Sequence, residues 1–368
     1  MTNNLWDPPV HAARLGFPTE KERLEYENRK IQTNKMLTRI IAQARKNAKP
    51  DHCYLCKGKC SSFANSHTVP RFTLRSIANH GKLALPLQQE IPTLGKSIGI
   101  GNAGTFHLIC SNCDNTRFQK YEDPVAYDKA PDNVMLAQIA LKNYLRLISK
   151  RHEEYQLYEL AKKRFDYGQD IAEDKQFWGE MDLREFERGA SYAVNAIQKQ
   201  SSGYYLCYHR TLDYVVPIAT QAAIAVICDF DEQIINNIYN ETPEYKIKYI
   251  HISVFPLKEK SVILLFIEDG EKRYRKFYKK LNALPVEDQL AAINYLIFSY
   301  TEDVFLHPDI LSMVQSNSAF MDVCRKSTDV EAYSVIEDPL PAMVKEFSLS
   351  QRTTIPNLLS REYALDLK

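Results

Sequence analysis

The chain has 368 residues, of which 25% are charged and 45% hydrophobic. These values are typical of a globular protein and exclude a largely disordered one. The length is roughly two to three times that of a common domain, so we expect two domains. The formal net charge of +1 gives no overall indication of a nucleic-acid or membrane partner. Basic residues outnumber acidic ones up to residue 123 and are outnumbered after it, so we expect any charge-based function in the N-terminal third.

The sequence offers no targeting or membrane segment. The N-terminus lacks the basic cap and the apolar run of a signal peptide, and the longest apolar stretches are too short to span a bilayer. We therefore expect a soluble, cytoplasmic protein with no membrane partner. Thiols stay reduced in that compartment, so the eight cysteines need an explanation other than disulfides. Four are scattered and are interpreted as small buried hydrophobic residues, namely Cys60, Cys207, Cys228 and Cys324.

The elements of the N-terminal half are predicted from periodicity. A long, mostly exposed helix is expected over residues 19–47 and ends before Pro50. The paired cysteines fall within residues 51–123, which we interpret as a compact module with a long internal loop over 80–104. A helical stripe of apolar residues then runs from Val134 to Ile148, and a further helix is expected over 182–200.

The C-terminal half changes to short runs rich in Val, Ile and Tyr, which predict strands. These runs are Tyr204–Tyr208, Asp213–Pro217, Ala222–Cys228, Lys248–Phe255 and Ser261–Phe266. Helices are expected again over 286–300 and 308–324, and the tail after residue 335 is expected to form an arm. The predicted fold class is α+β, divided into an N-terminal helical arm (1–50), a zinc-stabilised module (51–130), a larger α+β domain for substrate or partner binding (131–335) and a C-terminal tail (336–368).

Two C-x-x-C pairs predict a structural zinc site. They are Cys53-Tyr-Leu-Cys56 and Cys110-Ser-Asn-Cys113. Zn²⁺ prefers four soft ligands in a tetrahedron, and the two-residue spacer lets one tight turn present two thiolates to the ion. The two pairs together therefore point to one closed site. His52 and Cys60 are alternative ligands, and two unrelated thiol pairs are the alternative to a metal site.

The segment between the pairs contains Ser66-His67-Thr68-Val69-Pro70-Arg71. A zinc knuckle, a strand with a histidine, a loop and a second knuckle that opens a helix resemble the HNH, or ββα-metal, endonucleases with a treble-clef zinc frame. The resemblance covers about residues 50–128. It implies hydrolysis of phosphodiester bonds in DNA or, alternatively, RNA, and a divergent prokaryotic branch associated with phage defence.

The resemblance also implies roles for individual residues. His67 matches the general base, and an imidazole titrates near neutral pH, as such a base requires. Asp114 stands at the position of a ligand to a catalytic Mg²⁺ or Mn²⁺, Arg117 at the family's basic position, and Glu122 is two helical turns further on as a second carboxylate. Arg71 and Arg75 are expected to bind phosphates.

The pattern departs from the family at Ser66, which stands where a carboxylate ligand is usual. The alternative roles are structural: His67 as a hydrogen-bonding residue of the strand, Asp114 as a helix N-terminal carboxylate, and Glu122 as a salt-bridging residue. Two functions therefore stay open. One is a metal-dependent endonuclease whose larger domain binds substrate or a protein partner, and the other is a non-catalytic zinc module that binds nucleic acid or protein.

A basic and aromatic run near residue 275 has two interpretations. Basic residues alternating with aromatic rings can bind a single nucleic-acid strand by charge and stacking. An exposed amphipathic helix whose rings pack inward is the simpler interpretation, and we favour it. The run comprises Lys272, Arg273, Tyr274, Arg275, Lys276, Phe277, Tyr278, Lys279 and Lys280.

Overall fold

The computed structural model describes residues 28, 35–36, 38–88, 93–94, 97–162, 169–200, 203–240, 242, 244–329 and 338–366. Residues 28, 35, 36 and 38–47 are helical, which agrees with the helix expected over 19–47, and the other residues of that prediction lie outside the described part. Among the residues that the structure describes, no helix is both long enough and apolar enough to cross a bilayer.

The cysteine-containing region is built from short elements. The predicted loop over 80–104 is wrong in part, because the described residues there include strands β2 and β5, and Leu83 and Ala84 of β2 are buried. In chain order the elements are β1 (Ser66–His67), α2 (Arg71–Ser76), β2 (Lys82–Ala84), β3 (Leu87–Gln88), β4 (Thr93–Leu94), β5 (Ser97–Gly99), η1 (Ile100–Asn102), β6 (Thr105–Phe106), α3 (Ser111–Arg117) and η2 (Pro124–Asp128).

The rest of the chain is a mixture of long helices and strands, so the α+β class is confirmed. Its elements are α4 (Asn133–Lys162), α5 (Gln169–Lys199), β7 (Tyr204–Leu212), β8 (Ile218–Ile224), β9 (Ile250–Pro256), β10 (Ser261–Glu268), α6 (Arg275–Ala283), α7 (Val286–Tyr300), β11 (Val304–Leu306), η3 (Pro308–Ile310), α8 (Leu311–Ser316), α9 (Ser318–Asp329), α10 (Leu340–Glu346), η5 (Leu349–Thr353) and η6 (Arg361–Tyr363).

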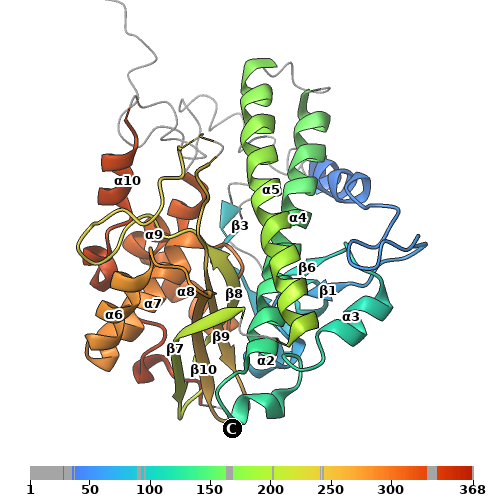
Figure 1. Ribbon diagram of the computed structural model, residues 1–368. Helices are drawn as coiled ribbons and strands as arrows, with labels where there is room; N and C mark the ends of the chain where they lie inside the picture. The colour runs from blue at the N-terminus through green and yellow to red at the C-terminus, as the bar shows by residue number, and fades with distance from the viewer. Residues whose placement is uncertain are drawn as a thin grey trace, which may run out of the picture.

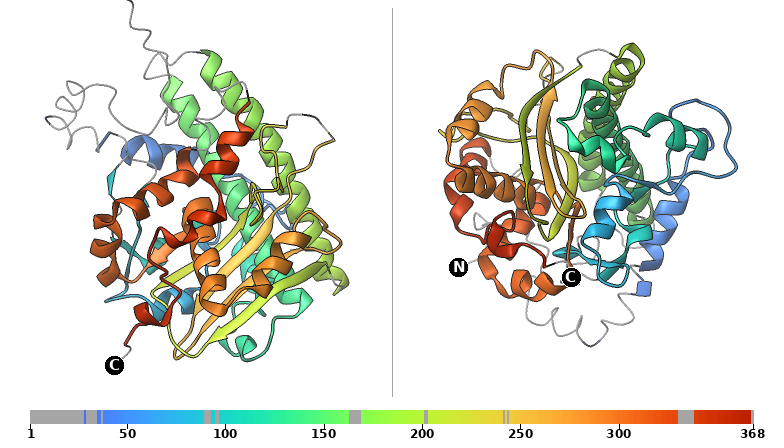
Figure 2. Two further views of the ribbon diagram at one scale, coloured as in Figure 1. Left: turned by 90° about the vertical axis from the view of Figure 1, so that its left-hand side faces the viewer. Right: turned by 90° about the horizontal axis from the view of Figure 1, so that it is seen from below.

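One antiparallel sheet organises the described residues. Its strand order is β5-β2-β11-β8-β9-β10-β7. Helices α4 and α5 cover one face of it, and the C-terminal helices cover the other (Figure 1, Figure 2). Strands β2 and β5 precede residue 130 and the other five follow it, so the sheet continues across the predicted domain boundary.

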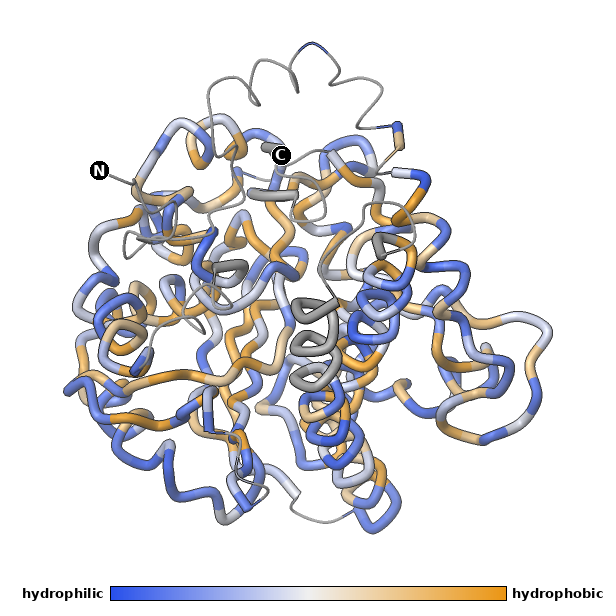
Figure 3. Tube along the Cα trace, turned by 90° about the horizontal axis from the view of Figure 1, so that it is seen from above, coloured by the Kyte–Doolittle hydropathy of each residue, from blue (hydrophilic) through white to orange (hydrophobic). Residues whose placement is uncertain are grey.

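The central strands are buried on both faces. Along β10, Ile263, Leu265 and Ile267 pack with the C-terminal helices, whereas Val262 and Leu264 belong to the core beneath α4 and α5. This alternation follows from the two-residue repeat of a strand. Figure 3 shows the hydrophobic segments mainly in the interior of the molecule. The runs of Val, Ile and Leu that predicted strands thus reflect a strand with two apolar faces.

Several predicted boundaries are wrong. Asp213–Pro217 is a connection between β7 and β8, and β8 begins and ends earlier than the predicted strand over Ala222–Cys228. The helix expected over 308–324 is divided into η3, α8 and α9. The expected arm after residue 335 is also wrong for residues 338–366, since Met343 and Leu358 of that segment are fully buried.

The basic and aromatic run adopts the simpler of its two interpretations. Phe277 of α6 and the preceding Tyr274 are fully buried, whereas Arg275, Lys276 and Lys279 are exposed. The rings of Tyr274 and Phe277 therefore pack inward and are not available for base stacking, whereas Tyr278 is partly buried and its ring centroid lies 5.5 Å from that of Tyr205.

Helices α4 and α5 approach each other closely at Gly189. A Cβ atom at this position would lie 2.3 Å from the ring of Tyr144 on α4. No side chain larger than hydrogen fits there without a shift of that buried ring. This contact holds the two long helices together above the sheet.

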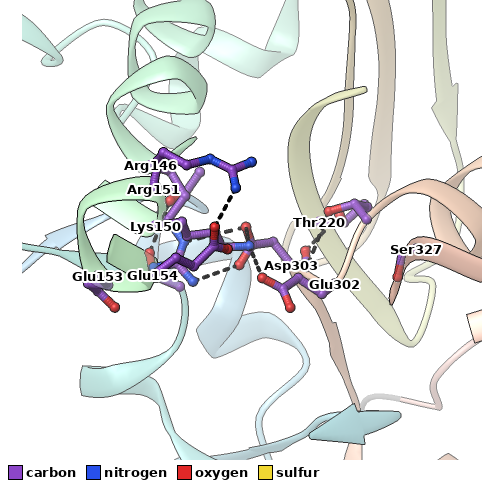
Figure 4. A network of polar contacts seen from close by, with 12 residues as sticks. Arg146, Lys150, Arg151, Glu153, Glu154, Thr220, Glu302, Asp303 and Ser327 are labelled. Atoms are coloured by element: carbon purple, nitrogen blue, oxygen red, sulfur yellow. Dashed lines mark hydrogen bonds and ion pairs between the residues drawn. The ribbon is translucent and has the colours of Figure 1, made fainter. Parts of the chain in front are cut away.

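A buried ionic cluster joins α4 to strand β11 (Figure 4). The Asp303 carboxylate accepts hydrogen bonds from Arg146 at 3.2 and 3.4 Å and forms an ion pair with Lys150 at 2.9 Å. Lys150 also pairs with Glu302. Burial opposes ionisation of Asp303, but the two cations outweigh it and hold the pKa of this carboxyl well below its usual range.

Removal of this carboxylate is expected to destabilise the protein. We predict that Asp303→Ala lowers the free energy of unfolding by about 3–5 kcal/mol, because the largely buried Arg146 then loses its ion-pair partner and Lys150 keeps only Glu302. Urea denaturation measures the change. Glu259→Ala, which removes a carboxylate that is 84% exposed, is the control and should change the value by less than about 0.5 kcal/mol. Equal effects of the two substitutions would contradict the role of Asp303.

Candidate functional site

The four paired cysteines converge on one point. Their sulfur atoms, from Cys53, Cys56, Cys110 and Cys113, all lie within 4.8 Å of one another. Zn–S bonds of about 2.3 Å in a tetrahedron place the sulfurs about 3.8 Å apart. The Cys56 and Cys110 sulfurs are 3.9 Å apart. The predicted ligand set is therefore confirmed as a cluster that could hold a metal ion, and its all-sulfur chemistry fits zinc.

Backbone hydrogen bonds lock the two knuckles together. The N–H of Tyr54 donates to the carbonyl of Leu108 at 2.9 Å, which joins the first knuckle to the segment that leads into the second. The N–H of Cys110 donates to the Cys53 sulfur at 3.3 Å. Cys110 is also the N-cap of α3, and its sulfur accepts from the N–H of Cys113 at 3.4 Å. The second knuckle thus coincides with the first turn of a helix, whose N–H groups favour a thiolate.

The thiols of the cluster differ in their tendency to ionise. Burial opposes ionisation of Cys53, but backbone N–H groups of Cys56, Cys110 and Leu55 outweigh it and lower its pKa to about 6. Burial raises the pKa of Cys113, and the three neighbouring sulfurs raise it further. Burial and the neighbouring sulfurs thus oppose ionisation of Cys113, and a bound Zn²⁺ would offset both effects.

The two alternative ligands lie outside the cluster. His52 is exposed, and its Nδ1 pairs with Asp51 at 2.7 Å. The Cys60 thiol donates to the carbonyl of Gly58 at 3.4 Å. Both residues neighbour the first knuckle in sequence, which explains why the sequence alone did not exclude them as metal ligands.

His67 lies on β1, which pairs with β6 so that His67 stands opposite Thr105. The next N–H in the chain, that of Thr68, donates to the carbonyl of Gly104 at 2.9 Å. Gly104 has φ +61°, a left-handed conformation that suits glycine and turns the chain into β6. Helix α3 begins within the second knuckle, so a strand, a second strand and a helix follow one another in this region.

The ring of His67 faces polar groups and is 6% exposed. Its Nε2 lies 2.9 Å from the carbonyl oxygen of Ile100 and 3.5 Å from Nε of Arg71. A carbonyl only accepts, so the shorter contact assigns the proton to Nε2 and makes the Arg71 contact a close approach, not a hydrogen bond. In the neutral ring, Nδ1 then keeps its lone pair.

The environment keeps this ring neutral. Burial lowers the pKa of His67 below its ordinary value; the carbonyl of Ile100 opposes this shift, and the cations Arg71 and Lys142 add to it. At neutral pH the histidine is therefore unprotonated. A general base must have this state before it can accept a proton from water.

Asp114 and Glu122, expected near a divalent ion, converge on an ammonium group. The Lys142 side chain, from α4, is completely buried. Its Nζ lies 2.7 Å from Asp114 Oδ1 and 3.1 Å from Glu122 Oε1. Burial raises the pKa of Glu122, although Lys142 acts in the opposite direction. Ser66, at the position of the usual carboxylate, donates to Asp114 at 2.6 Å and accepts from Lys142 at 2.7 Å.

The three arginines of the predicted site lie on helices α2 and α3. Arg71 and Arg75 are exposed and lie one turn apart on α2, so they share a face. Arg71 adjoins His67, which brings that face to the histidine. Arg117 is exposed in the last turn of α3. The structure thus places Arg71 beside His67, with Nε 3.5 Å from Nε2, and leaves Arg75 and Arg117 exposed on α2 and α3.

Lys142 is the member of this site that sequence reasoning missed. A signal was present, because Lys142 lies three residues after Ile139 and three before Leu145, within the apolar stripe of α4. A lysine on such a face is either bent out to solvent or buried with counter-charges. The partners come from segments far away in the sequence, so only the folded chain identifies them.

Comparisons with protein-family models, with curated proteins and with solved structures found no significant match to the chain.

Zinc content tests the cysteine cluster. We predict that the purified chain binds one zinc ion and that Cys110→Ser loses it, with reduced solubility, because binding of such an ion contributes to folding. Elemental analysis of the two proteins measures the content. Cys60→Ser is the matched control, since this thiol neighbours the cluster and is not part of it. Unchanged zinc in Cys110→Ser would refute the ligand assignment.

The pH dependence of stability tests the state of His67. Its pKa in the folded chain is lower than the value of about 6.5 for an unfolded chain. Below pH 6.5 the unfolded chain therefore binds a proton that the folded chain does not, and the folded state loses stability as pH falls. Denaturation at pH 7.5 and pH 5 should show a larger loss for the wild type than for His67→Asn. His80→Asn, at an exposed position, should retain the wild-type dependence.

Proposed function

We propose that the chain is a nucleic-acid phosphodiesterase of the HNH type, with residues 50–128 as a treble-clef zinc module. The observation that carries the proposal is a neutral His67 placed between two zinc knuckles and in contact with an exposed arginine. The order β1, β6, α3 and the single four-sulfur cluster support it, since both follow the arrangement that the sequence resemblance implies.

In this proposal His67 acts as the general base. It takes a proton from water while the water oxygen attacks phosphorus, the bond from phosphorus to the leaving oxygen breaks, and the leaving oxygen is protonated from solvent. Arg71 binds the phosphate beside the ring, and Arg75 and Arg117 bind neighbouring phosphates. The structural zinc supplies no step and holds the two knuckles in place. We propose DNA as the first substrate to test, with RNA second, and a cytoplasmic role in phage defence.

The family resemblance also implies a catalytic Mg²⁺ or Mn²⁺ held by Asp114 and Glu122. Asp114 Oδ1 and Glu122 Oε1 bind the Lys142 ammonium, so these oxygens do not fit such an ion. The proposed hydrolysis therefore passes through no divalent ion at this position. Asp114 and Glu122 are positioning residues, since they bind Lys142 next to the strand that carries His67.

The contact of Lys142 with Asp114 and Glu122 also favours a second function. Lys142 neutralises the two carboxylates, as expected of a centre that has lost its catalytic ion and kept its frame. The alternative is a non-catalytic zinc module that binds nucleic acid through Arg71 and Arg75, or a protein partner through the C-terminal α+β region.

Cleavage assays with plasmid DNA and with RNA, with and without Mg²⁺ or Mn²⁺, test the proposal. We expect cleavage by the wild type and a loss of about 10²–10⁴-fold in His67→Ala, the usual contribution of a general base. His80→Ala is the control and should leave cleavage unchanged. If the wild type cleaves neither nucleic acid but binds DNA, and Arg71→Ala with Arg75→Ala weakens binding, the second function holds in place of the first.

A further inference from the structure

The environment of Lys142 matches that of a bound cation. An ammonium has three N–H donors, and three oxygens surround this one: Ser66 Oγ and Asp114 Oδ1 at 2.7 Å each and Glu122 Oε1 at 3.1 Å. Every donor therefore has an acceptor. Ser66 lies on β1, Asp114 on α3 and Glu122 in the segment after α3. Lys142 lies on α4.

Aromatic rings complete the surroundings. The Nζ of Lys142 lies 4.2 Å from the centroid of Phe118 and 5.9 Å from that of Phe106. Both rings are fully buried. The face of such a ring attracts a cation, and more strongly where water is excluded. The rings thus favour a positive charge at this nitrogen, as the carboxylates do.

The same atoms exclude a second cation. A Mg²⁺ ion would need oxygens at about 2.0–2.1 Å in an octahedral set. Asp114 Oδ1 already accepts from both Ser66 and Lys142, and an ion bound to the same oxygens would lie close to the ammonium and be repelled by it. Arg71, which contacts His67, adds further positive charge nearby.

The burial of Lys142 makes an incidental salt bridge a poor explanation. Its side chain is 0% exposed, and an ammonium in such a place is costly unless it is balanced by charge and hydrogen bonds. An apolar residue would continue the stripe of α4 without that cost. The carboxylates, in turn, are only partly buried, at 20% and 39% exposure, so they alone do not need an internal partner.

We propose that the Lys142 ammonium is the resident cation of this centre and occupies the place of a divalent ion between Ser66, Asp114 and Glu122. The centre is thereby independent of divalent metal, and the ion-binding set of oxygens becomes available only when the ammonium is removed. The inference does not require that the centre be catalytic.

Binding of Mn²⁺, followed by the loss of the free-ion signal in electron paramagnetic resonance, tests the inference without any assay of activity. We expect the zinc-loaded wild type to bind no Mn²⁺ at this position. Lys142→Met keeps an apolar side chain in the stripe and removes the charge, so it should gain Mn²⁺ binding about tenfold or more tighter than any non-specific binding measured for the wild type. The added substitution Asp114→Asn should abolish the gain.

Lys326→Met is the matched control. Lys326 is also buried, at 5% exposure, and bonds to Tyr295 and Gln351, but among the described residues its ammonium forms an ion pair with a single carboxylate, that of Glu346. Its removal should create no Mn²⁺ site. Wild-type binding that Asp114→Asn removes would overturn the inference, and so would a folded Lys142→Met that gains no Mn²⁺.

If Lys142→Met does not fold, neutralisation of its partners decides the question. The variant Lys142→Met, Asp114→Asn, Glu122→Gln should recover a cooperative unfolding transition, because it has no charge left to balance. Failure of this variant to fold would overturn the counter-ion role. Failure of the cleavage assay alone leaves these outcomes unaffected, so the two proposals are separable.

Discussion

The folded chain depends on a row of three cations along one face of helix α4. Lys142, Arg146 and Lys150 follow one another at intervals of four residues, so they lie on the same face of the helix. Each is balanced by carboxylates from another part of the chain: Lys142 by the segment after the second knuckle, and the other two by Asp303 next to β11. Arg146 also donates to the carbonyl of Thr105 on β6 at 3.0 Å. The row therefore connects the cysteine-containing region to the central sheet through one helix.

The sequence predicted the parts of this arrangement that are encoded locally. The two C-x-x-C pairs identified the four sulfurs, because two residues are the spacing at which one turn presents two ligands to one ion. Helix α7 over Val286–Tyr300 was predicted to the residue, since apolar residues recur along it and Pro285 precedes its start. Strands β9 and β10 were located to within two residues at each end by their runs of branched and aromatic side chains.

The failures lie where the fold is decided by distant partners. Strand β2 is only three residues long and is a strand because β11 and β5 flank it, which no local pattern reveals. The segment over Asp213–Pro217 has strand-like residues but leaves the sheet, and the Ser261 hydroxyl bonds to the N–H of Val216 at 2.9 Å in place of a strand partner. Likewise, Asp114 and Glu122 were assigned to a divalent ion because the sequence shows carboxylates but not the lysine, 20 or more residues away, that meets them.

The balance of charge around His67 bears on the chemistry that remains possible there. The carboxylates are directed toward Lys142, and Arg71 is the cation nearest to the ring on the exposed side. A phosphate approaching the ring would thus meet a guanidinium, whose planar donors bind two phosphate oxygens at once. Lys142 is completely buried and donates to Ser66 of β1, so it helps to fix the strand that carries His67. The two cations near His67 therefore differ in place: the exposed Arg71 adjoins the ring, and the buried Lys142 pairs with the carboxylates.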